Sequence, residues 1–563
     1  MSRIIGIDVG GTNTNAAFLD DGILVATAKH PTDHQNLLAG ASAVLEEITA
    51  AIPQCGRERL ELHLSTTLTT NAIVEGRGEP AAAIIAPGPG MNPADLRFPF
   101  PVHAVAGAID HRGRETAPLD PAEVRRAINS IRKEGINALA AVGKFSARNP
   151  RHELELNELI QREFPEFNPV TLGHRLSGRL NFPRRVTTAV LNASVSRLQI
   201  EFAAMVKELS KRYGIGKRIF LLKADGGTMR LAESLVRPIE TTLSGPAASI
   251  MGALALGSLD DRIIVTLDIG GTTTEIAALV DAEPLDERDG AVIAGYRTLV
   301  PALFSRSIGL GGDSRVYWSE GKLAIGPERQ GPPLALGGPA LTPTDAVIAL
   351  GKAPFGDSQK ARAELERFGK PAGLEPKELA ERIVAVFCEK AASEIRAVFD
   401  YLNRIPAYTV SEALAPRRLK PEKLIGMGGP AGYFIPKIAA KMGLDCQVLP
   451  YAEAANAVGA AASRPTAAIH LRVDTALGKM IVPELDEIEE IQRAMFFDAK
   501  KVREMARKKL SAYAAGIGID PAQPEIDIVD EEIFNVVRGF YTAGRIFALK
   551  AQIRPGINRV TLG

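Results

Sequence analysis

Two short stretches of this sequence carry residue types that suit phosphate and magnesium binding. Residues 7–14 read IDVGGTNT and residues 267–274 read LDIGGTTT, and each follows an apolar run typical of a strand. In each stretch an Asp at the end of the strand precedes two glycines and a run of small polar residues. Backbone amides in a glycine-rich turn form a concave anion site, and an adjacent Asp can hold a hydrated Mg²⁺ ion. Each stretch is therefore a candidate phosphate loop.

The duplication is more informative than either copy alone. A single Asp-Gly-Gly-Thr turn is common in hairpins, but both copies repeat the order strand, Asp, hydrophobe, Gly-Gly-Thr, polar residue, Thr and second strand. The length of a whole domain separates Asp8 from Asp268. Self-similarity at this distance predicts two related lobes, each presenting a phosphate loop to one shared cleft.

A hydroxyl-rich stretch between these loops is a candidate for substrate contact. Five of the six residues from Ser65 to Thr70 carry hydroxyl groups, and Asn71 follows them. Such a stretch suits a strand end with a polar loop facing a ligand. A Thr-rich strand that ends in a helix cap explains it equally well, so both interpretations stay open.

A further glycine-rich segment, residues 424–431, is expected to end a strand and open a helix. Its Gly-x-Gly-x-x-Ala pattern also meets the dinucleotide-binding fingerprint. That fold would need an acidic residue at the end of the next strand, whereas Asp445 precedes the strand expected at 447–449. The segment therefore favours a loop that covers adenosine. A Walker-type loop, with its Gly-Lys-Ser/Thr ending, is absent from the sequence.

The elements that must position these loops alternate between strand and helix, which predicts an α/β fold. The expected strands lie at 3–7, 14–19, 23–29, 81–85, 138–142 and 219–223, and the expected helices at 37–52, 121–134, 184–213 and 376–404. Residues 241–248 are small and polar and suit either a hinge or tight packing. A third Gly-Gly-Thr turn at 224–228 lacks a matching second strand. Beyond about residue 464, a charged helix at 485–515 and strands at 525–529, 533–540 and 545–553 predict a small accessory region.

Composition places the chain among ordinary multidomain proteins. At 563 residues it is too long for one hydrophobic core, and we expect domains at 1–185, 186–463 and 464–563. With 67 basic and 66 acidic residues, no charge excess favours nucleic acid or an anionic membrane as a partner. The cysteines (Cys55, Cys388 and Cys446) and the eight histidines form no metal-binding pattern.

No run approaches the roughly 20 apolar residues of a membrane helix, and no signal peptide precedes the first strand. A cytoplasmic protein is expected.

The order of these motifs resembles the hydantoinase A/5-oxoprolinase family, which includes an acetone carboxylase subunit and belongs to the actin/hexokinase/Hsp70 fold group. The stretches that carry the resemblance are Asp8–Thr14, Thr66–Ala72 with Glu75, Asn149–Glu153, Thr187–Ala193, Leu243–Ala248, Asp268–Ala277, Ile308–Ser314, Thr342–Asp345 and Met427–Pro430. The resemblance implies an α/β fold with two actin-like ATPase (ribonuclease H-like) lobes around a nucleotide cleft, plus a small C-terminal α+β region.

The resemblance also implies a site that binds ATP with Mg²⁺ or Mn²⁺. Asp8 and Asp268 are then the catalytic residues and metal ligands, and Asp313 is a further candidate for metal contact. The implied phosphate contacts are Gly10, Gly11, Thr12, Asn13, Thr14, Gly270, Gly271, Thr272, Thr273 and Thr274. Gly426, Gly428, Gly429 and Pro430 would cover the adenosine, and Thr66, Thr67, Thr70 and Asn71 would line the substrate side.

The activity implied is ATP-dependent opening of a cyclic amide such as a hydantoin or 5-oxoproline, through phosphorylation of the carbonyl oxygen. Leu64 and Ser65 replace the usual His-Gly of the family, and Asp313 replaces a usual Gly, so the substrate could differ. A small-molecule kinase, a carboxylase subunit, or an ATPase that reactivates a partner enzyme are the alternatives. A separate hydantoinase B-like subunit and an oligomeric assembly are expected.

Overall fold

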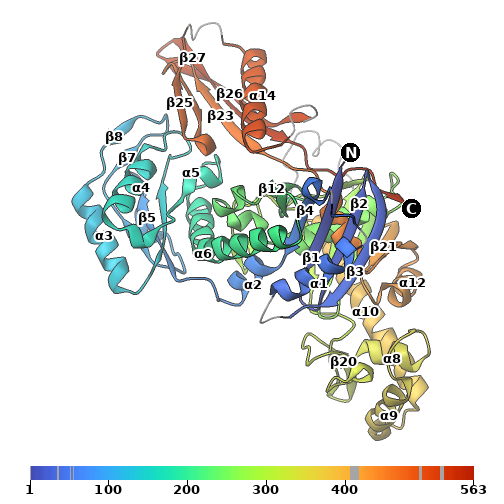
Figure 1. Cartoon of the computed structure of the whole chain (residues 1–563). Helices are drawn as coiled ribbons and strands as arrows, with labels where there is room; N and C mark the ends of the chain where they lie inside the picture. Colours follow the sequence, from blue (N-terminus) through green and yellow to red (C-terminus); the bar gives the residue numbers. More distant parts are fainter. Residues whose placement is uncertain are drawn as a thin grey trace.

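The first candidate phosphate loop joins two strands of a seven-stranded mixed sheet near the N-terminus (Figure 1). The computed structural model describes residues 2–33, 37–50, 52–54, 56–405, 418–492, 497–519 and 525–563. The sheet has the order β12-β11-β4-β1-β2-β3-β28, and its strands are β1 (Arg3–Val9), β2 (Asn13–Asp20), β3 (Ile23–Pro31), β4 (Glu61–Thr66), β11 (Ile219–Leu222), β12 (Thr228–Arg230) and β28 (Thr561–Leu562). β1 runs antiparallel to β2 and parallel to β4. Helix α1 (Leu37–Ala50) and the C-terminal half of α6 (Phe182–Arg212) pack apolar side chains against this sheet.

A second sheet repeats this arrangement around the other candidate loop. Its strands are β13 (Ile264–Ile269), β14 (Thr274–Val280), β15 (Glu283–Pro284), β18 (Ser305–Ile308), β21 (Lys423–Met427) and β22 (Asp445–Val448). β13 runs antiparallel to β14 and parallel to β21, as β1 does to β2 and β4. β22 continues the parallel side, as β11 does, and β18 pairs with β14, as β3 pairs with β2. The two sheets therefore share strand order and direction around the two loops.

Two helices rich in Ala and Gly pack between these sheets. α7 (Ser244–Leu256) packs its apolar side chains with the second sheet, and α13 (Ala455–Ala462) does so with the first. A Cβ atom at Gly459 would overlap the carbonyl oxygen of Ala248, and a Cβ at Gly6 would overlap that of Ala457. The small residues thus allow close backbone contact. Tight packing, one of the two interpretations of residues 241–248, is observed at Ala248, and a hinge stays a prediction.

A third sheet, entirely parallel, is inserted between α2 (Leu68–Val74) and α6. It has the order β10-β9-β5-β6, and its elements are β5 (Ala81–Ala86), β6 (Val102–Ala104), β9 (Ala138–Gly143), β10 (Thr171–Leu172), α3 (Pro121–Lys133), α4 (Arg151–Glu163) and α5 (Gly173–Leu176). α3 and α4 pack on one face of this sheet, and the N-terminal half of α6 packs on the other. α6 therefore ties the inserted sheet to the first sheet.

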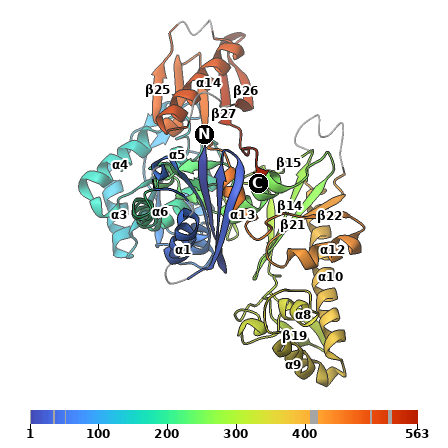
Figure 2. The same cartoon turned by 45° about the vertical axis from the view of Figure 1, so that its right-hand side comes forward.

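Short elements occupy the connections between the larger ones. They are the hairpins β7 (Ala108–Ile109) with β8 (Glu115–Ala117), β16 (Val292–Ile293) with β17 (Tyr296–Arg297), and β19 (Val316–Ser319) with β20 (Lys322–Ile325), and the helices α8 (Pro343–Ala349) and α9 (Ser358–Gly369). α8, α9 and β20 form a separate lower part of the molecule beside the long α10 (Pro376–Leu402) (Figures 1 and 2). Helix α12 (Ala431–Met442) packs with α10 over the second sheet.

The C-terminal residues form a five-stranded sheet with one helix on it. The order is β25-β24-β23-β27-β26, and the elements are β23 (Ala468–Asp474), β24 (Lys479–Val482), β25 (Glu487–Glu490), β26 (Ile526–Arg538), β27 (Tyr541–Ile553) and α14 (Ala499–Gly516). A helix is predicted at 485–515, but α14 begins only at Ala499, and residues 487–490 form the strand β25. Leu485, Ile488 and Ile491 have helical spacing, but pairing with β24 makes residues 487–490 a strand.

One other expectation differs from the structure. The Gly-Gly-Thr turn at 224–228 does have a second strand, because β12 pairs with β11 to close a hairpin. Helix α6, which begins at Phe182, continues across the expected domain boundary at 185/186, and the domain division itself stays a prediction. Cys388 and Cys446 are unpaired, and Cys55 lies outside the described residues. No helix in the described ranges is both long and apolar enough to cross a membrane.

Candidate active site

The two candidate loops, loop 1 (residues 8–14) and loop 2 (residues 268–274), face each other. Each closes with the same hydrogen bond, from Gly10 N to Asn13 O (3.1 Å) and from Gly270 N to Thr273 O (2.9 Å). A Cβ atom at Gly271 would lie 3.3 Å from Oγ1 of Thr12. The tips of loops far apart in the sequence are therefore in direct contact, with Gly11 and Thr272 exposed to solvent.

The two aspartates lie on either side of one amide side chain. Asn456 Nδ2 donates a hydrogen bond to Oδ2 of Asp268 (2.9 Å), and Ser249 Oγ donates another (2.6 Å). The pKa of Asp8 is raised to about 6, chiefly by burial and in part by the charge of Asp268, whereas Ser65 and Asn456 act in the opposite direction. Ser65 Oγ is near Asp8 but falls outside full hydrogen-bond geometry. Sequence reasoning missed Asn456, whose only signal was a polar residue within an Ala/Gly-rich helix.

Glu275 is an acidic residue beside Asp268 that the sequence motifs did not single out. It lies directly opposite Asp268 in the pairing of β13 with β14. Burial raises its pKa to about 7, and Asp268 adds to the increase, although a hydrogen bond from Ser307 Oγ (2.6 Å) opposes it. Its Oε2 atom is buried and has no hydrogen-bond partner among the described residues. The corresponding residue of loop 1 is Asn15, which pairs with Asp8 and also has a buried, unpartnered oxygen.

The last Thr of each loop points into the protein. Thr14 is fully buried, and its hydroxyl shares a hydrogen bond with that of Thr32 (3.0 Å), which in turn donates to Gly10 O (2.9 Å). Thr274 is also fully buried and donates to the carbonyl oxygen of Leu310. Thr12, Asn13 and Thr273 are instead partly exposed at the loop tips.

Residues 311–313 support loop 2 from its other side. Gly312 N donates to Gly270 O (2.9 Å), and Asp313 N donates to Gly271 O (2.7 Å). A Cβ at Gly271 would lie 2.6 Å from Asp313 Oδ2, so the Asp313 carboxylate stands beside the loop tip. That carboxylate forms an ion pair with Arg329 (3.3 Å), while burial raises its pKa. The predicted Asp313 therefore lies close to both loops.

The adenosine segment adjoins loop 2. Gly428 has a φ of 93°, and a Cβ there would lie 2.9 Å from Oδ1 of Asp268, so only Gly suits this close approach. Pro430 packs against Gly312, and Gly429 faces open space. Gly426 differs from the others because it lies inside β21 beneath Ile435 of α12.

The hydroxyl-rich stretch lies next to loop 1. Thr66 is buried at the end of β4, and Thr67, Thr70 and Asn71 are partly exposed on α2 or at its start. Thr67 Oγ1 approaches Val9 O (3.5 Å), and Asn71 Nδ2 donates to Thr67 Oγ1 (3.3 Å). Thr70 Oγ1 accepts a hydrogen bond from the amide of Leu243 (2.9 Å) at the start of α7.

The donor set fits a metal–nucleotide complex better than a metal held by protein alone. Within the described ranges, no three His, Cys, Asp or Glu side chains come together as a metal-binding group. Mg²⁺ commonly takes one or two carboxylates and completes its shell with phosphate oxygens and water. Asp8 and Asp268 would supply such carboxylates. The open space beside the amide of Gly11 leaves room for a phosphate.

Comparisons with known proteins agree with this arrangement. The chain is 27% identical over 449 residues to the acetophenone carboxylase gamma subunit of Aromatoleum aromaticum, covering 70% of this chain and 60% of that protein. It is 25% identical over 491 residues to the caprolactamase subunit alpha of Pseudomonas jessenii, covering 79% and 68%. The crystal structure of an ATP-dependent caprolactamase from Pseudomonas jessenii superposes with a TM-score of 0.70 at 21% identity, covering 99% of this chain and 88% of that one.

The chain thus spans less than two thirds of the acetophenone carboxylase subunit's length. The superposition shows that it shares the mixed α/β fold of the caprolactamase chain. Residues 4–164 match the family model for the hydantoinase/oxoprolinase N-terminal region, and residues 185–469 match the model for hydantoinase/oxoprolinase. The chain belongs to the hydantoinase/oxoprolinase family.

Proposed function

We propose that this protein is an ATP-dependent hydrolase that opens a cyclic amide, such as a hydantoin, 5-oxoproline or a related lactam. The observation that carries this proposal is the contact between loop 1 and loop 2, with Asp8 and Asp268 on either side of Asn456. Membership of the hydantoinase/oxoprolinase family and similarity to a caprolactamase support the substrate class.

Phosphoryl transfer solves a specific chemical problem in this reaction. A cyclic amide resists water because nitrogen stabilises its carbonyl group and leaves poorly. Transfer of the γ-phosphoryl group of ATP to the amide oxygen releases ADP and makes the carbon electrophilic. Water then adds to that carbon, and the resulting tetrahedral adduct breaks its C–N bond to release the ring nitrogen as an amine. A second water hydrolyses the acyl phosphate that remains to carboxylate and phosphate. Positioning and charge stabilisation supply most of the catalysis in such transfers.

The roles of the site residues follow from their positions. The amides of Gly10–Asn13 and Gly270–Thr273 would hold the phosphates from two sides, and Gly428–Pro430 would cover the adenosine. Asp8 and Asp268 would hold Mg²⁺ or Mn²⁺, directly or through water. Thr67, Thr70 and Asn71, which are partly exposed next to loop 1, would face the amide substrate.

The duplicated strand order supports two actin-like ATPase lobes as the architecture. In this proposal the inserted sheet belongs to the N-terminal region, the second sheet to residues 186–463, and the C-terminal sheet is an accessory α+β domain. The printed names of two relatives, a gamma subunit and a subunit alpha, support a multisubunit assembly with a separate hydantoinase B-like chain. The acetophenone carboxylase relative favours a carboxylase subunit as the second candidate function.

Product analysis distinguishes these functions. The purified protein is incubated with ATP, Mg²⁺ and hydantoin, 5-oxoproline or caprolactam, while ADP release and ring opening are followed. Substrate-stimulated ADP release with an opened ring supports the proposal. A lasting phosphorylated product, or turnover that requires bicarbonate and yields a carboxylated product, contradicts it.

A further inference from the structure

The inserted sheet has a topology that creates a second ligand-binding edge. β5 is followed by β6 on one side and then by β9 and β10 on the other, giving the order β10-β9-β5-β6 with all strands parallel. In open parallel sheets of this order, ligands bind outside the carboxyl ends of the strands, where the strand order reverses. Here that point lies between β5 and β9. The loops that follow these strands meet there, because Lys144 Nζ donates to Pro89 O (3.2 Å).

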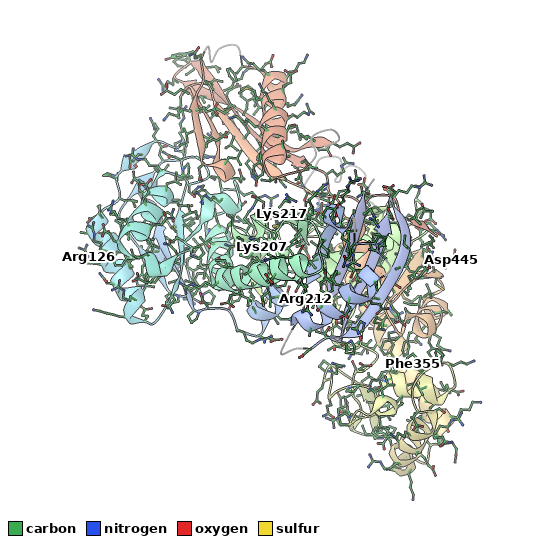
Figure 3. The ribbon with its side chains drawn as sticks, in the orientation of Figure 1. Arg126, Lys207, Arg212, Lys217, Phe355 and Asp445 are labelled. Carbon is green, nitrogen blue, oxygen red and sulfur yellow. The ribbon has the colours of Figure 1, made fainter. Side chains whose placement is uncertain are left out.

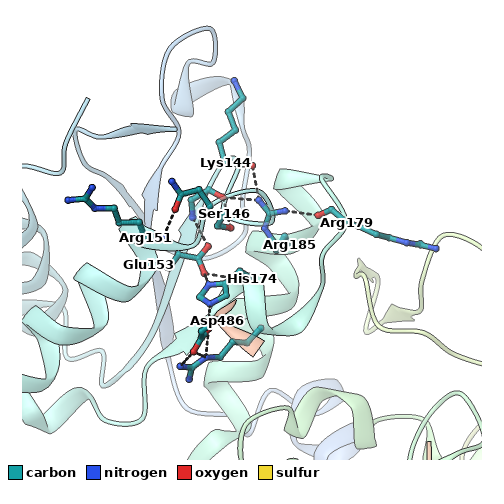
Figure 4. A network of polar contacts seen from close by, with 11 residues as sticks. Lys144, Ser146, Arg151, Glu153, His174, Arg179, Arg185 and Asp486 are labelled. Carbon is teal, nitrogen blue, oxygen red and sulfur yellow. Dashed lines mark hydrogen bonds and ion pairs between the residues drawn. The ribbon is translucent and has the colours of Figure 1, made fainter. Parts of the chain in front are cut away.

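The C-terminal sheet covers this edge (Figure 1). Arg112, from the β7–β8 hairpin, forms an ion pair with Asp474 of β23 (2.9 Å). His174, which follows β10, bonds to Glu153 (2.5 Å) and to Asp486 of the C-terminal domain (2.6 Å) (Figure 4). Burial lowers the pKa of His174, but these two carboxylates raise it by more. The two domains are therefore held together by fully paired charges on both sides of the edge.

Two arginines at this edge are not paired. Arg148 lies in the loop after β9, and Arg472 lies on the face of the C-terminal sheet that carries Asp474. Arg472 is only 8% exposed, and its Nε atom is buried without a hydrogen-bond partner. Within the described ranges, neither arginine forms an ion pair, in contrast to Arg112 beside them. Burial lowers the pKa of both guanidinium groups, and in Arg472, where it falls to about 10, repulsion from Arg148 contributes.

An unpaired, desolvated guanidinium group is costly unless an anion joins it. Two carboxylates, Asp474 and Glu532, act on both arginines. Asp474 is already paired with Arg112, and Glu532 lies in the same cross-strand row as Arg472 through Ala548. Glu532 is exposed and makes no ion pair with either arginine. An incoming carboxylate or phosphate group would satisfy both, because planar guanidinium groups bind such oxyanions through parallel hydrogen bonds.

We propose that Arg148 and Arg472 form a binding site for a small oxyanion, a carboxylate or phosphate group, between the inserted sheet and the C-terminal domain. The site uses no residue of loop 1 or loop 2. It therefore stands independently of the proposed cyclic-amide activity.

The test measures anion-dependent stability of the whole protein. Thermal melting is followed with saturating Mg·ADP present, so that the nucleotide site cannot account for the response. Sodium phosphate, sodium bicarbonate and sodium acetate are each compared with sodium chloride at equal ionic strength. The variants are Arg472→Met, Arg148→Met and the matched control Arg126→Met. Arg126 projects from the outer surface of α3, far from this edge (Figure 3).

We expect at least one oxyanion to raise the melting temperature of the wild-type protein above the chloride control. Both site variants should weaken the apparent affinity for that anion at least tenfold, and Arg126→Met should leave it unchanged. A response to phosphate alone identifies a phosphate ligand, and a response to acetate or bicarbonate identifies a carboxylate-type ligand. If no oxyanion stabilises the wild type, or if Arg472→Met and Arg148→Met respond as the wild type does, the proposal is overturned.

Where a site variant fails to fold, a second measurement keeps the test decisive. Glu532→Gln removes the nearby competing negative charge without removing an arginine. It should tighten binding of the same anion severalfold. An unchanged or weakened affinity in Glu532→Gln contradicts the site.

Discussion

Loop 1 and loop 2 close with the same backbone hydrogen bond and follow strands paired in the same directions. Their surroundings nevertheless differ. Loop 1 is supported by the Thr32 hydroxyl and borders the hydroxyl-rich α2. Loop 2 is enclosed by Asp313 on one side and Gly428 on the other. The residue opposite the loop aspartate is the neutral Asn15 in the first case and the acidic Glu275 in the second.

This difference suggests that the two copies of the loop contact different parts of the bound reactants. Asp268, Glu275 and Asp313 all lie near loop 2, although among the described residues they form no three-ligand metal group. We therefore expect that side to meet a metal ion together with the phosphates it carries. Neutral amides and hydroxyl groups surround loop 1, so that side is suited to a polar, uncharged amide. The backbone symmetry therefore supplies two candidate phosphate loops, while the side chains make only one of them strongly acidic.

Removal of either aspartate is expected to have the largest effect. Asp8→Ala and Asp268→Ala should each lower ATP turnover by at least about 1,000-fold, because each removes a carboxylate that faces the metal and the reacting phosphate. Steady-state ADP release measures this loss, and circular dichroism should show an unchanged fold. Normal ATPase rates in both variants would refute the assignment of these loops.

Matched glycine substitutions test whether the two loop tips are packed differently. Gly271→Ala should destabilise the protein by about 1–3 kcal/mol, since its Cβ would press on Asp313 and Thr12. Gly11→Ala should stay within about 1 kcal/mol of the wild type, because no atom lies within 4 Å of the new Cβ. Urea unfolding measures both changes.

The same pair separates packing from binding. Gly11→Ala should still weaken ATP binding, because the new methyl group occupies the open space left for a phosphate. Equal stability of the two variants would contradict the observed asymmetry. Unchanged ATP affinity in Gly11→Ala would place the phosphates elsewhere.

The sequence was sufficient to predict two matching loops, and the structure shows matching turns there, because each loop is formed by local sequence. Each loop is a continuous stretch in which strand end, Asp and glycines occur in order. Asn456 and Glu275 could not be found this way. Asn456 reaches Asp268 only because α13 packs against α7. Glu275 lies beside Asp268 only because β14 pairs with β13.

Longer-range pairing also explains the fold features that were missed. The strands at 81–85 and 138–142 were expected, but nothing in their apolar pattern says that they pair with each other in a separate sheet. The paired charges between the inserted sheet and the C-terminal domain join residues more than 300 positions apart, such as Arg112 and Asp474. Periodicity reports which face of an element is buried, and it carries no information about its partner.

The pH dependence of stability, measured without nucleotide or metal, gives a third test, with an expected effect of intermediate size. Folding raises the pKa of Asp8 from 3.8 to about 6 and that of Glu275 from 4.5 to about 7. The folded state therefore binds protons more tightly, so stability should increase as pH falls from about 7.5 toward 4.5. Each group should contribute about 1–3 kcal/mol to this increase.

Isosteric variants assign the two parts of that pH dependence. Asp8→Asn should remove the part between pH 4 and 6, and Glu275→Gln the part between about 4.5 and 7, as measured by urea unfolding at each pH. If the free energy of unfolding instead increases as pH rises through this range, the raised pKa values of Asp8 and Glu275 are wrong.

The smallest expected effects concern the two buried threonines. Thr274→Val leaves the Leu310 carbonyl oxygen without its donor, whereas Thr14→Val leaves a Thr32 hydroxyl that still donates to Gly10 O. An unsatisfied buried carbonyl costs about 1–3 kcal/mol, and loss of one of several hydroxyl contacts costs about 1 kcal/mol. Urea unfolding should therefore rank Thr274→Val as the more damaging change. The KM for ATP should remain within about twofold of the wild type in both variants, because neither hydroxyl is free to meet a phosphate. A large increase in the KM for ATP in either variant would show that its hydroxyl turns outward to contact the nucleotide. Such an increase in both variants would mean that the two loops bind phosphate more similarly than their side-chain contacts in this structure indicate.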